Sequence, residues 1–133
     1  MKDEMTIEQE FTVGSETVIE SPCPWSDFGV VFEDDGQTGY FYGFDLSGKV
    51  MTILDTVHIY NVTNIADRHI PSRISIVWSK DGLKSALYIN TYPHAVFDFE
   101  SKRAYCRTGF PLPMDNWSQE GHEWDDKALE LFK

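Results

Sequence analysis

The strongest constraint on the fold is a series of short strand-forming segments separated by turn residues. Residues 28–33 (Phe-Gly-Val-Val-Phe-Glu) favour an extended strand, because β-branched and aromatic residues are enriched in strands. Residues 34–39 hold two Asp and two Gly, which is typical of a turn, and the aromatic residues 40–44 favour a returning strand. This part of the chain therefore predicts a β-hairpin.

The same pattern continues through most of the chain. Further hairpins are predicted at residues 11–19, 74–89 and 94–107, and residues 50–61 predict a long strand whose odd positions face one side. Helical segments do not alternate with the strands, so a parallel α/β fold is excluded. We expect a mainly β (α+β) domain of six to eight strands, built as an antiparallel hairpin-rich sheet, an open barrel or a sandwich.

The C-terminal residues predict one α-helix. Its apolar residues recur at i, i+4, i+7 and i+8, on one face of the helix: Trp124, Ala128, Leu131 and Phe132. A helix this short is marginal in water, so its stability must come from packing. We expect it to dock on the β core, and the alternative is that its apolar face serves a partner or a second subunit.

Length and composition indicate one domain. The chain has 133 residues, 41% hydrophobic and 25% charged, which is enough to build a core. We assign residues 1–133 to a single domain and residues 1–9 to a mobile acidic lead-in. The sequence predicts neither a membrane span nor a secretory signal. Cys23 and Cys106 form no zinc-binding pattern. Because no export signal is predicted, we expect both to be reduced thiols in a cytoplasmic protein.

The net charge of −11 is concentrated at the two ends of the chain. Residues 1–35 hold ten acidic residues and one basic residue, and residues 115–133 hold six and two. Nucleic acid is disfavoured as a partner, because phosphate binding needs clusters of Lys and Arg. A basic protein is favoured through complementary electrostatics. The alternative is that the acidic surface only keeps the protein soluble.

The hairpin at residues 94–107 predicts one group of polar side chains. A turn centred on residues 100–103 places Asp98 opposite Tyr105 and diagonal to Arg107, with His94 on the same face. The other face is apolar and predicted to be buried: Ala95, Phe97, Phe99, Ala104 and Cys106. The polar face is a candidate binding surface, although an ordinary ion pair gives the same pattern.

Asp55 is a second candidate, because it lies among apolar residues of the predicted strand at 50–61. A buried carboxylate needs a hydrogen-bonding or charged partner, and functional sites often contain such groups. A purely structural ion pair would explain it equally well. We expect Asp55 to be buried and paired with an Arg, a His or a hydroxyl, and His58 to lie on the opposite face of the strand.

No sequence motif identifies an enzyme. The four histidines lack a metal-binding spacing, and the chain has no P-loop, nucleophile elbow or dinucleotide-binding motif. We therefore expect neither a metal nor a cofactor. The enzymatic alternative is a small hydrolase or ligand-binding enzyme. Its pocket would be built from Asp55, His58, His94, Asp98 and Arg107, of which the first four are the catalytic candidates.

Several segments together resemble one protein family. They are Phe-Glu-Asp-Asp-Gly at 32–36, Thr-Gly-Tyr-Phe-Tyr at 38–42, His-Ile-Tyr-Asn-Val at 58–62, Val-Trp-Ser-Lys-Asp-Gly at 77–82, Tyr-Pro-His-Ala-Val-Phe-Asp-Phe at 92–99 and Tyr-Cys-Arg-Thr-Gly-Phe-Pro at 105–111. They are similar to a family of small bacterial hypothetical proteins classed as a domain of unknown function. The resemblance implies a bacterial, cytoplasmic, single-domain protein and implies no catalytic residues.

Charge and motifs together favour a binding protein over an enzyme. The acidic ends and the lack of a catalytic motif predict a non-enzymatic protein that binds another protein. In its most concrete form, it is an acidic inhibitor or immunity-type partner of a basic protein. Neither nucleic acid nor a membrane is an expected partner.

Overall fold

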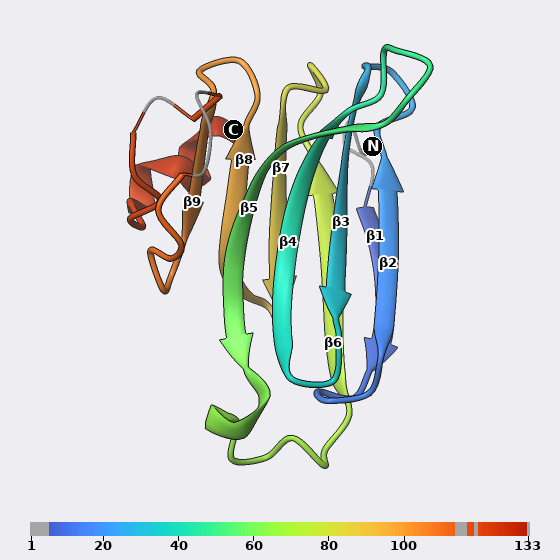
Figure 1. Cartoon of the computed structure of the whole chain (residues 1–133), viewed down its shortest axis with the longest axis vertical. Coiled ribbons are helices and arrows are strands. Elements are labelled where there is room, and N and C mark those ends of the chain that lie inside the picture. The colour runs from blue at the N-terminus through green and yellow to red at the C-terminus, as the bar shows by residue number, and fades with distance from the viewer. Residues whose placement is uncertain (1–5, 114–116, 119, 133) are drawn as a thin grey trace.

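The computed structural model describes residues 6–113, 117–118 and 120–132, and in this part of the chain two antiparallel sheets pack face to face as a β-sandwich (Figure 1). One sheet has five strands in the order β1 (Thr6–Phe11), β6 (Ser72–Trp78), β7 (Lys84–Ile89), β8 (Tyr92–Asp98) and β9 (Arg103–Cys106). The other has four, in the order β2 (Thr17–Pro22), β3 (Phe28–Asp34), β4 (Thr38–Asp45) and β5 (Thr52–Asn61). The predicted mainly β architecture is confirmed, in its sandwich form.

The predicted hairpin at residues 28–44 is also confirmed, as the pair β3–β4. Its turn is fixed locally by Asp35, whose Oδ1 accepts hydrogen bonds from the backbone amides of Gln37 and Thr38 at 2.9 and 2.8 Å. Such side-chain-to-backbone bonds are the reason that Asp favours turns. Local chemistry was therefore sufficient to predict this element.

The hairpin expected at residues 11–19 is wrong, because its two arms belong to different sheets. β1 pairs with β6, whereas β2 pairs with β3. Between them the chain crosses from one sheet to the other, and the Gly14 amide donates to Asp34 Oδ2 at 2.7 Å. β1 also includes residues 6–9, which were expected to be part of a mobile lead-in; residues 1–5 lie outside the described residues.

The core fills the space between the sheets. The largest fully buried apolar side chains are Trp78, Phe32, Phe41, Phe97, Ile74, Ile76 and Leu87. The Trp78 indole N–H donates to Ser21 Oγ at 2.9 Å, which joins the two sheets through a buried hydrogen bond. This hydrogen bond offsets the cost of removing the indole N–H from water when the large ring is buried.

The C-terminal helix is a 3₁₀ segment, η2 (Asp126–Phe132), and not the expected α-helix. The Ala128 amide bonds to the Asp125 carbonyl, three residues back, as in a 3₁₀ turn. The element nevertheless docks as predicted on the outer face of the five-stranded sheet, where Ala128 is buried beside Val96 and Tyr105. Apolar spacing located the packing face, but it did not determine the hydrogen-bonding pattern of so short a segment.

One further 3₁₀ turn, η1 (Val62–Asn64), follows β5. None of the helices in the described ranges has the length and apolar character needed to cross a membrane.

Candidate protein-binding face

The predicted polar group on the β8–β9 hairpin forms in a different register. Asp98 pairs with Arg103 and Val96 with Tyr105, so the pairing differs by two positions from the expected one, and Asp98 does not lie opposite Tyr105. The loop closes with Lys102 in the left-handed region at φ 56°, a conformation that the sequence did not indicate. Because the shift is even, the faces are preserved. The residues predicted to be buried are buried: Ala95, Phe97, Phe99, Ala104 and Cys106.

The polar face of this hairpin is covered by the C-terminal segment. Asp98 and Tyr105 are buried, and Asp98 Oδ1 accepts a hydrogen bond from the Ser101 amide at 3.1 Å. The Arg107 guanidinium lies 3.9 Å from the ring centroid of Trp124 and 4.6 Å from that of Tyr92. Cation–π contacts of this kind stabilise packing. In this geometry Tyr105 and Arg107 support the docking of the C-terminal segment, and Asp98 holds the β8–β9 turn.

Asp55 is buried and paired with a histidine, as predicted. Its Oδ2 lies 2.7 Å from Nε2 of His122, a fully buried residue whose Nδ1 faces the Pro111 carbonyl. Because both ring nitrogens face acceptors, the doubly protonated imidazolium satisfies both. Burial lowers the pKa of His122, but the hydrogen bond and the charge of Asp55 outweigh it, so the pKa is raised. The pair ties the segment before η2 to β5.

His58 and Cys106 lie near this pair but have other partners. His58 Nδ1 is 3.2 Å from Thr108 Oγ1, and its Nε2 is 3.0 Å from Asn61 Oδ1. The Cys106 thiol lies 3.6 Å from the same Thr108 hydroxyl and is completely buried. A thiol without solvent access is a poor nucleophile. The arrangement therefore joins β5 to β9 without presenting a reactive group.

His94 lies apart from Asp55 and His58. Its ring packs edge-on against Tyr92, and burial together with the nearby Arg107 charge lowers the pKa of His94 to about 4. Among the described residues, no hydrogen bond, ion pair or ring contact joins Asp55 or His58 to His94, Asp98 or Arg107. Within the same part of the chain, no group of three or more His, Cys, Asp or Glu is placed to hold a metal ion.

The outer face of the four-stranded sheet was not singled out from the sequence. It is formed by the side chains that alternate with the buried ones, and cross-strand neighbours include Glu20–Val31, Val31–Tyr42 and Phe44–Ile53. Ile53 was expected to face the same side as Val57, but a register shift between Gly43 and Phe44 turns it outward, where it is 53% exposed. Val18, on the edge strand β2, is 58% exposed. Regular alternation could not predict this, because one bulge reverses the faces.

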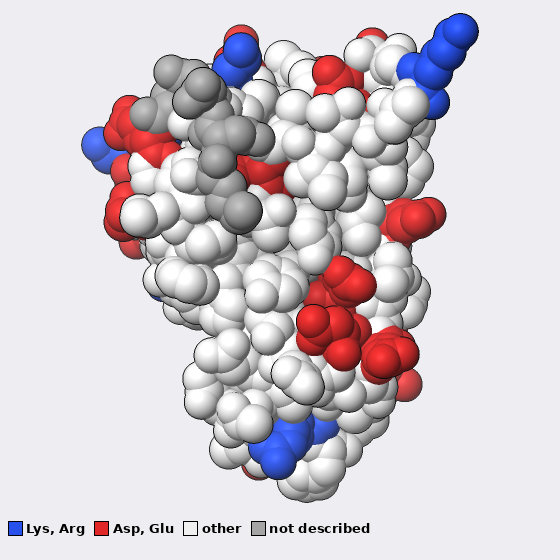
Figure 2. Space-filling model, in the orientation of Figure 1, with Lys and Arg blue, Asp and Glu red and all other residues white. Residues whose placement is uncertain are grey.

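This face is also acidic. The strands β2 to β5 contain no Lys or Arg. Of their five acidic residues, Asp34 and Asp55 are buried, whereas Glu20 and Glu33 lie at outward positions, opposite Val31 and Tyr40. Figure 2 views this side of the molecule: red acidic groups lie among uncharged side chains, and blue basic groups appear only towards the periphery. The face therefore combines exposed apolar groups with negative charge.

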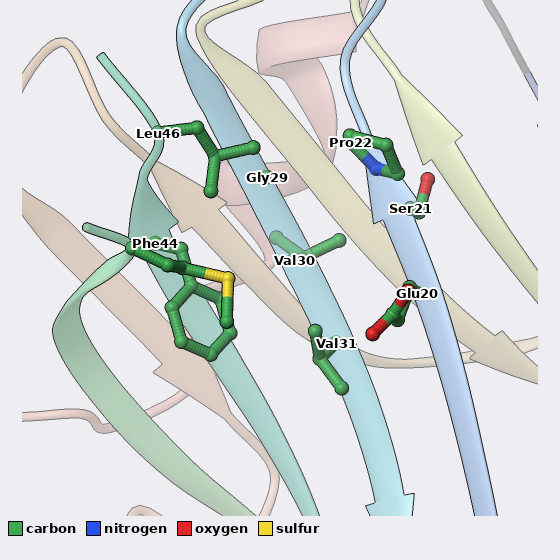
Figure 3. Close-up of a pocket in the computed structure, with 9 residues that line it drawn as sticks. Glu20, Ser21, Pro22, Gly29, Val30, Val31, Phe44 and Leu46 are labelled. Carbon is green, nitrogen blue, oxygen red and sulfur yellow. The ribbon is translucent and has the colours of Figure 1, made fainter. Parts of the chain in front are cut away.

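A groove of about 210 Å³ crosses the face between β2 and β4 (Figure 3). Its lining residues are Glu20, Ser21, Pro22, Gly29, Val30, Val31, Phe44, Leu46 and Met51. Glu20 and Pro22 lie on one side, and Phe44 and Leu46 on the other. Gly29 lies between them, and a Cβ there would come within 2.9 Å of Leu46 Cδ1, so a larger residue would displace the Leu46 side chain.

Comparison with known proteins identifies the family. Residues 11–133 match the model of a family described as uncharacterised proteins conserved in bacteria, DUF2251. An uncharacterised protein of Haemophilus influenzae is 37% identical over 119 residues, which cover 87% of this chain and 74% of the relative. No solved structure matches the chain. The chain therefore belongs to this family of uncharacterised bacterial proteins, as its motifs predicted.

Proposed function

We propose that the protein is a non-enzymatic binding protein, that its partner is a basic protein, and that the outer face of the four-stranded sheet is the contact surface. The observation that carries the proposal is the combination on one face of exposed apolar side chains and carboxylates, in strands that contain no Lys or Arg. Protein interfaces combine apolar and polar groups on one surface.

Electrostatics favours a basic partner over a neutral or acidic one. Negative charge on the face would accelerate encounter with a positive surface and would repel an acidic one. The hydrogen-bonded sheet also holds its side chains in place before binding, which reduces the entropy lost on association. An inhibitor or immunity protein needs only to cover its target, so this face would be sufficient without any catalytic group.

Affinity purification from the native bacterial host tests this proposal. The wild-type chain should capture a protein with a basic surface, and the double variant Val18→Lys with Ile53→Lys should lose it. Both positions are exposed on the proposed face, so the substitutions should leave the fold intact. The control is Glu8→Lys on β1, which makes a single positive substitution on the other sheet.

The captured protein should then be tested for direct binding at two salt concentrations. The proposal predicts a weaker complex at higher salt and loss of binding only for the variant of the proposed face. Equal binding by wild type and the double variant, or a partner with an acidic surface, would contradict it.

A further inference from the structure

We infer that the groove between β2 and β4 is a binding site for one Lys or Arg side chain of the partner, with the aliphatic part in the groove and the cation on Glu20. The inference rests on the proposed function, because it names the part of a basic partner that the face would hold.

The chemistry of the lining selects an amphipathic cation. Apolar walls come from Pro22, Phe44 and Leu46, and Glu20 is the single charged residue among those that line the groove. Lys and Arg have an apolar stem that ends in a positive charge, so they match both parts of such a site. An anion would face a carboxylate without a compensating base, and an uncharged apolar group would desolvate Glu20 without pairing it.

Glu20 differs from the other acidic residues in the strands of this sheet. Four of the five already accept hydrogen bonds: Glu33 from Tyr42, Asp34 from Gly14, Gly36 and Tyr60, Asp45 from Ser47, and Asp55 from His122. The Glu20 carboxylate makes no hydrogen bond or ion pair within the described part of the chain. The one unengaged carboxylate of these strands therefore lies at the groove.

The size and rigidity of the groove favour a single side chain. Its volume of about 210 Å³ is below the roughly 300–1,000 Å³ of pockets that take drug-sized ligands. Its walls are held in place, because the Leu46 amide bonds to the Asp27 carbonyl at 2.7 Å and the Cys23 amide to the Phe28 carbonyl at 2.9 Å. A site formed before binding loses little entropy when one side chain enters it.

The test is an NMR titration of the ¹⁵N-labelled full chain with two probes. Nα-acetyl-lysine methylamide carries the cation, and Nα-acetyl-norleucine methylamide has a similar stem without it. The lysine probe should shift the amide signals of Gly29, Val31 and Leu46, with a Kd in the range of about 1 mM or weaker. The norleucine probe should bind about three- to fivefold more weakly, the effect of one exposed ion pair.

Three variants distinguish binding in the groove from attraction to acidic residues in general. Glu20→Gln should make the two probes bind equally, whereas Glu16→Gln, which removes the same charge next to β2 but outside the groove lining, should leave their difference unchanged. Val31→Arg should abolish binding of both probes, because its own side chain can fill the groove.

Equal binding of both probes to the wild type, or shifts that do not involve the groove, would overturn the inference. If the outer face still captures a basic protein in that case, the proposed function stands and only the anchoring groove is wrong. If the double Lys variant of the outer face keeps the partner, the proposed function itself fails.

Discussion

The outer faces of the two sheets differ: the C-terminal segment covers one and leaves the other open. On the five-stranded sheet, η2 covers Val96 and Tyr105, and the Arg107 guanidinium stacks on Trp124. On the four-stranded sheet, Val18 and Ile53 are more than half exposed, and Glu20 has no partner within the described residues. The first face buries its apolar groups under the C-terminal segment, and Arg107 stacks on a ring of that segment. The second leaves its apolar groups exposed, which is why we propose that an external partner meets them.

The distribution of basic residues follows the same division. In the five-stranded half, the buried Lys84 ammonium lies 2.9 Å from Asp81 and 2.7 Å from Glu100. The strands of the other sheet contain no Lys or Arg to neutralise their carboxylates. The ion pairs of Lys and Arg among the described residues thus lie in the five-stranded half. In the other sheet, the buried Asp55 pairs with His122, and Glu20 on the open face has no partner within the described residues.

Removal of the covering segment should give the largest effect. Deleting residues 124–133 exposes Tyr105, Val96 and Ala86, so we expect the free energy of unfolding to fall by about 4 kcal/mol or more. Urea denaturation followed by tryptophan fluorescence and circular dichroism measures it. A truncated chain with the wild-type midpoint would show that the segment does not stabilise the sheet, and the contrast between the two faces would then be lost.

Asp55→Ala should have the next largest effect. It removes the carboxylate that faces the buried His122, and stranding one member of a buried pair costs about 3 kcal/mol or more. Asp45→Ala is the control, because Asp45 is partly exposed and its side chain bonds to Ser47, two residues away; its loss should cost about 1 kcal/mol or less. Similar chemical-denaturation midpoints for the two variants would contradict a structural role of the Asp55–His122 pair.

The same pair should make stability depend on pH in one direction. The pKa of His122 is raised in the folded protein, so the stabilisation is complete below its ordinary value of 6.5 and is lost as the pH rises through the folded value. Between pH 6 and pH 9, the wild type should therefore lose stability relative to His122→Gln. The difference is measured by thermal unfolding at each pH, and a parallel pair of curves would argue against the imidazolium form.

Changes on the open face should have the smallest effect on folding. Val18→Lys with Ile53→Lys should alter the free energy of unfolding by less than about 0.5 kcal/mol per site, because both side chains are already largely in water. Differential scanning calorimetry against wild type checks this. A large loss of stability would indicate that these residues support the fold. The open face would then stabilise the protein as the covered face does, and the contrast between them would be lost.

Features that depend on residues close together in the sequence could be predicted from it. The β3–β4 turn was predictable because Asp35 bonds to amides two and three residues away. The faces of β8 were predictable from alternation, even though the unpredicted left-handed Lys102 moved the register by two positions. These features depend on residues that are neighbours along the chain.

The remaining features depend on contacts between distant residues. Asp55 was identified as a buried carboxylate, but its partner His122 is 67 positions away and no spacing rule joins them. The open face was missed because the register shift in β5 turns Ile53 outward, and because only the structure reveals which sheet η2 covers. The candidate groove was therefore beyond what periodicity could predict.

Hydroxyl-radical footprinting of the complex with the captured basic protein shows which face the partner covers. Met51 and Ile53 report on the open face, and Tyr92 and Ile70 report on other parts of the surface; all four are more than half exposed. We expect oxidation of Met51 and Ile53 to fall in the complex while oxidation of Tyr92 and Ile70 is unchanged. Protection of Tyr92 with undiminished oxidation of Met51 and Ile53 would place the partner elsewhere and contradict it.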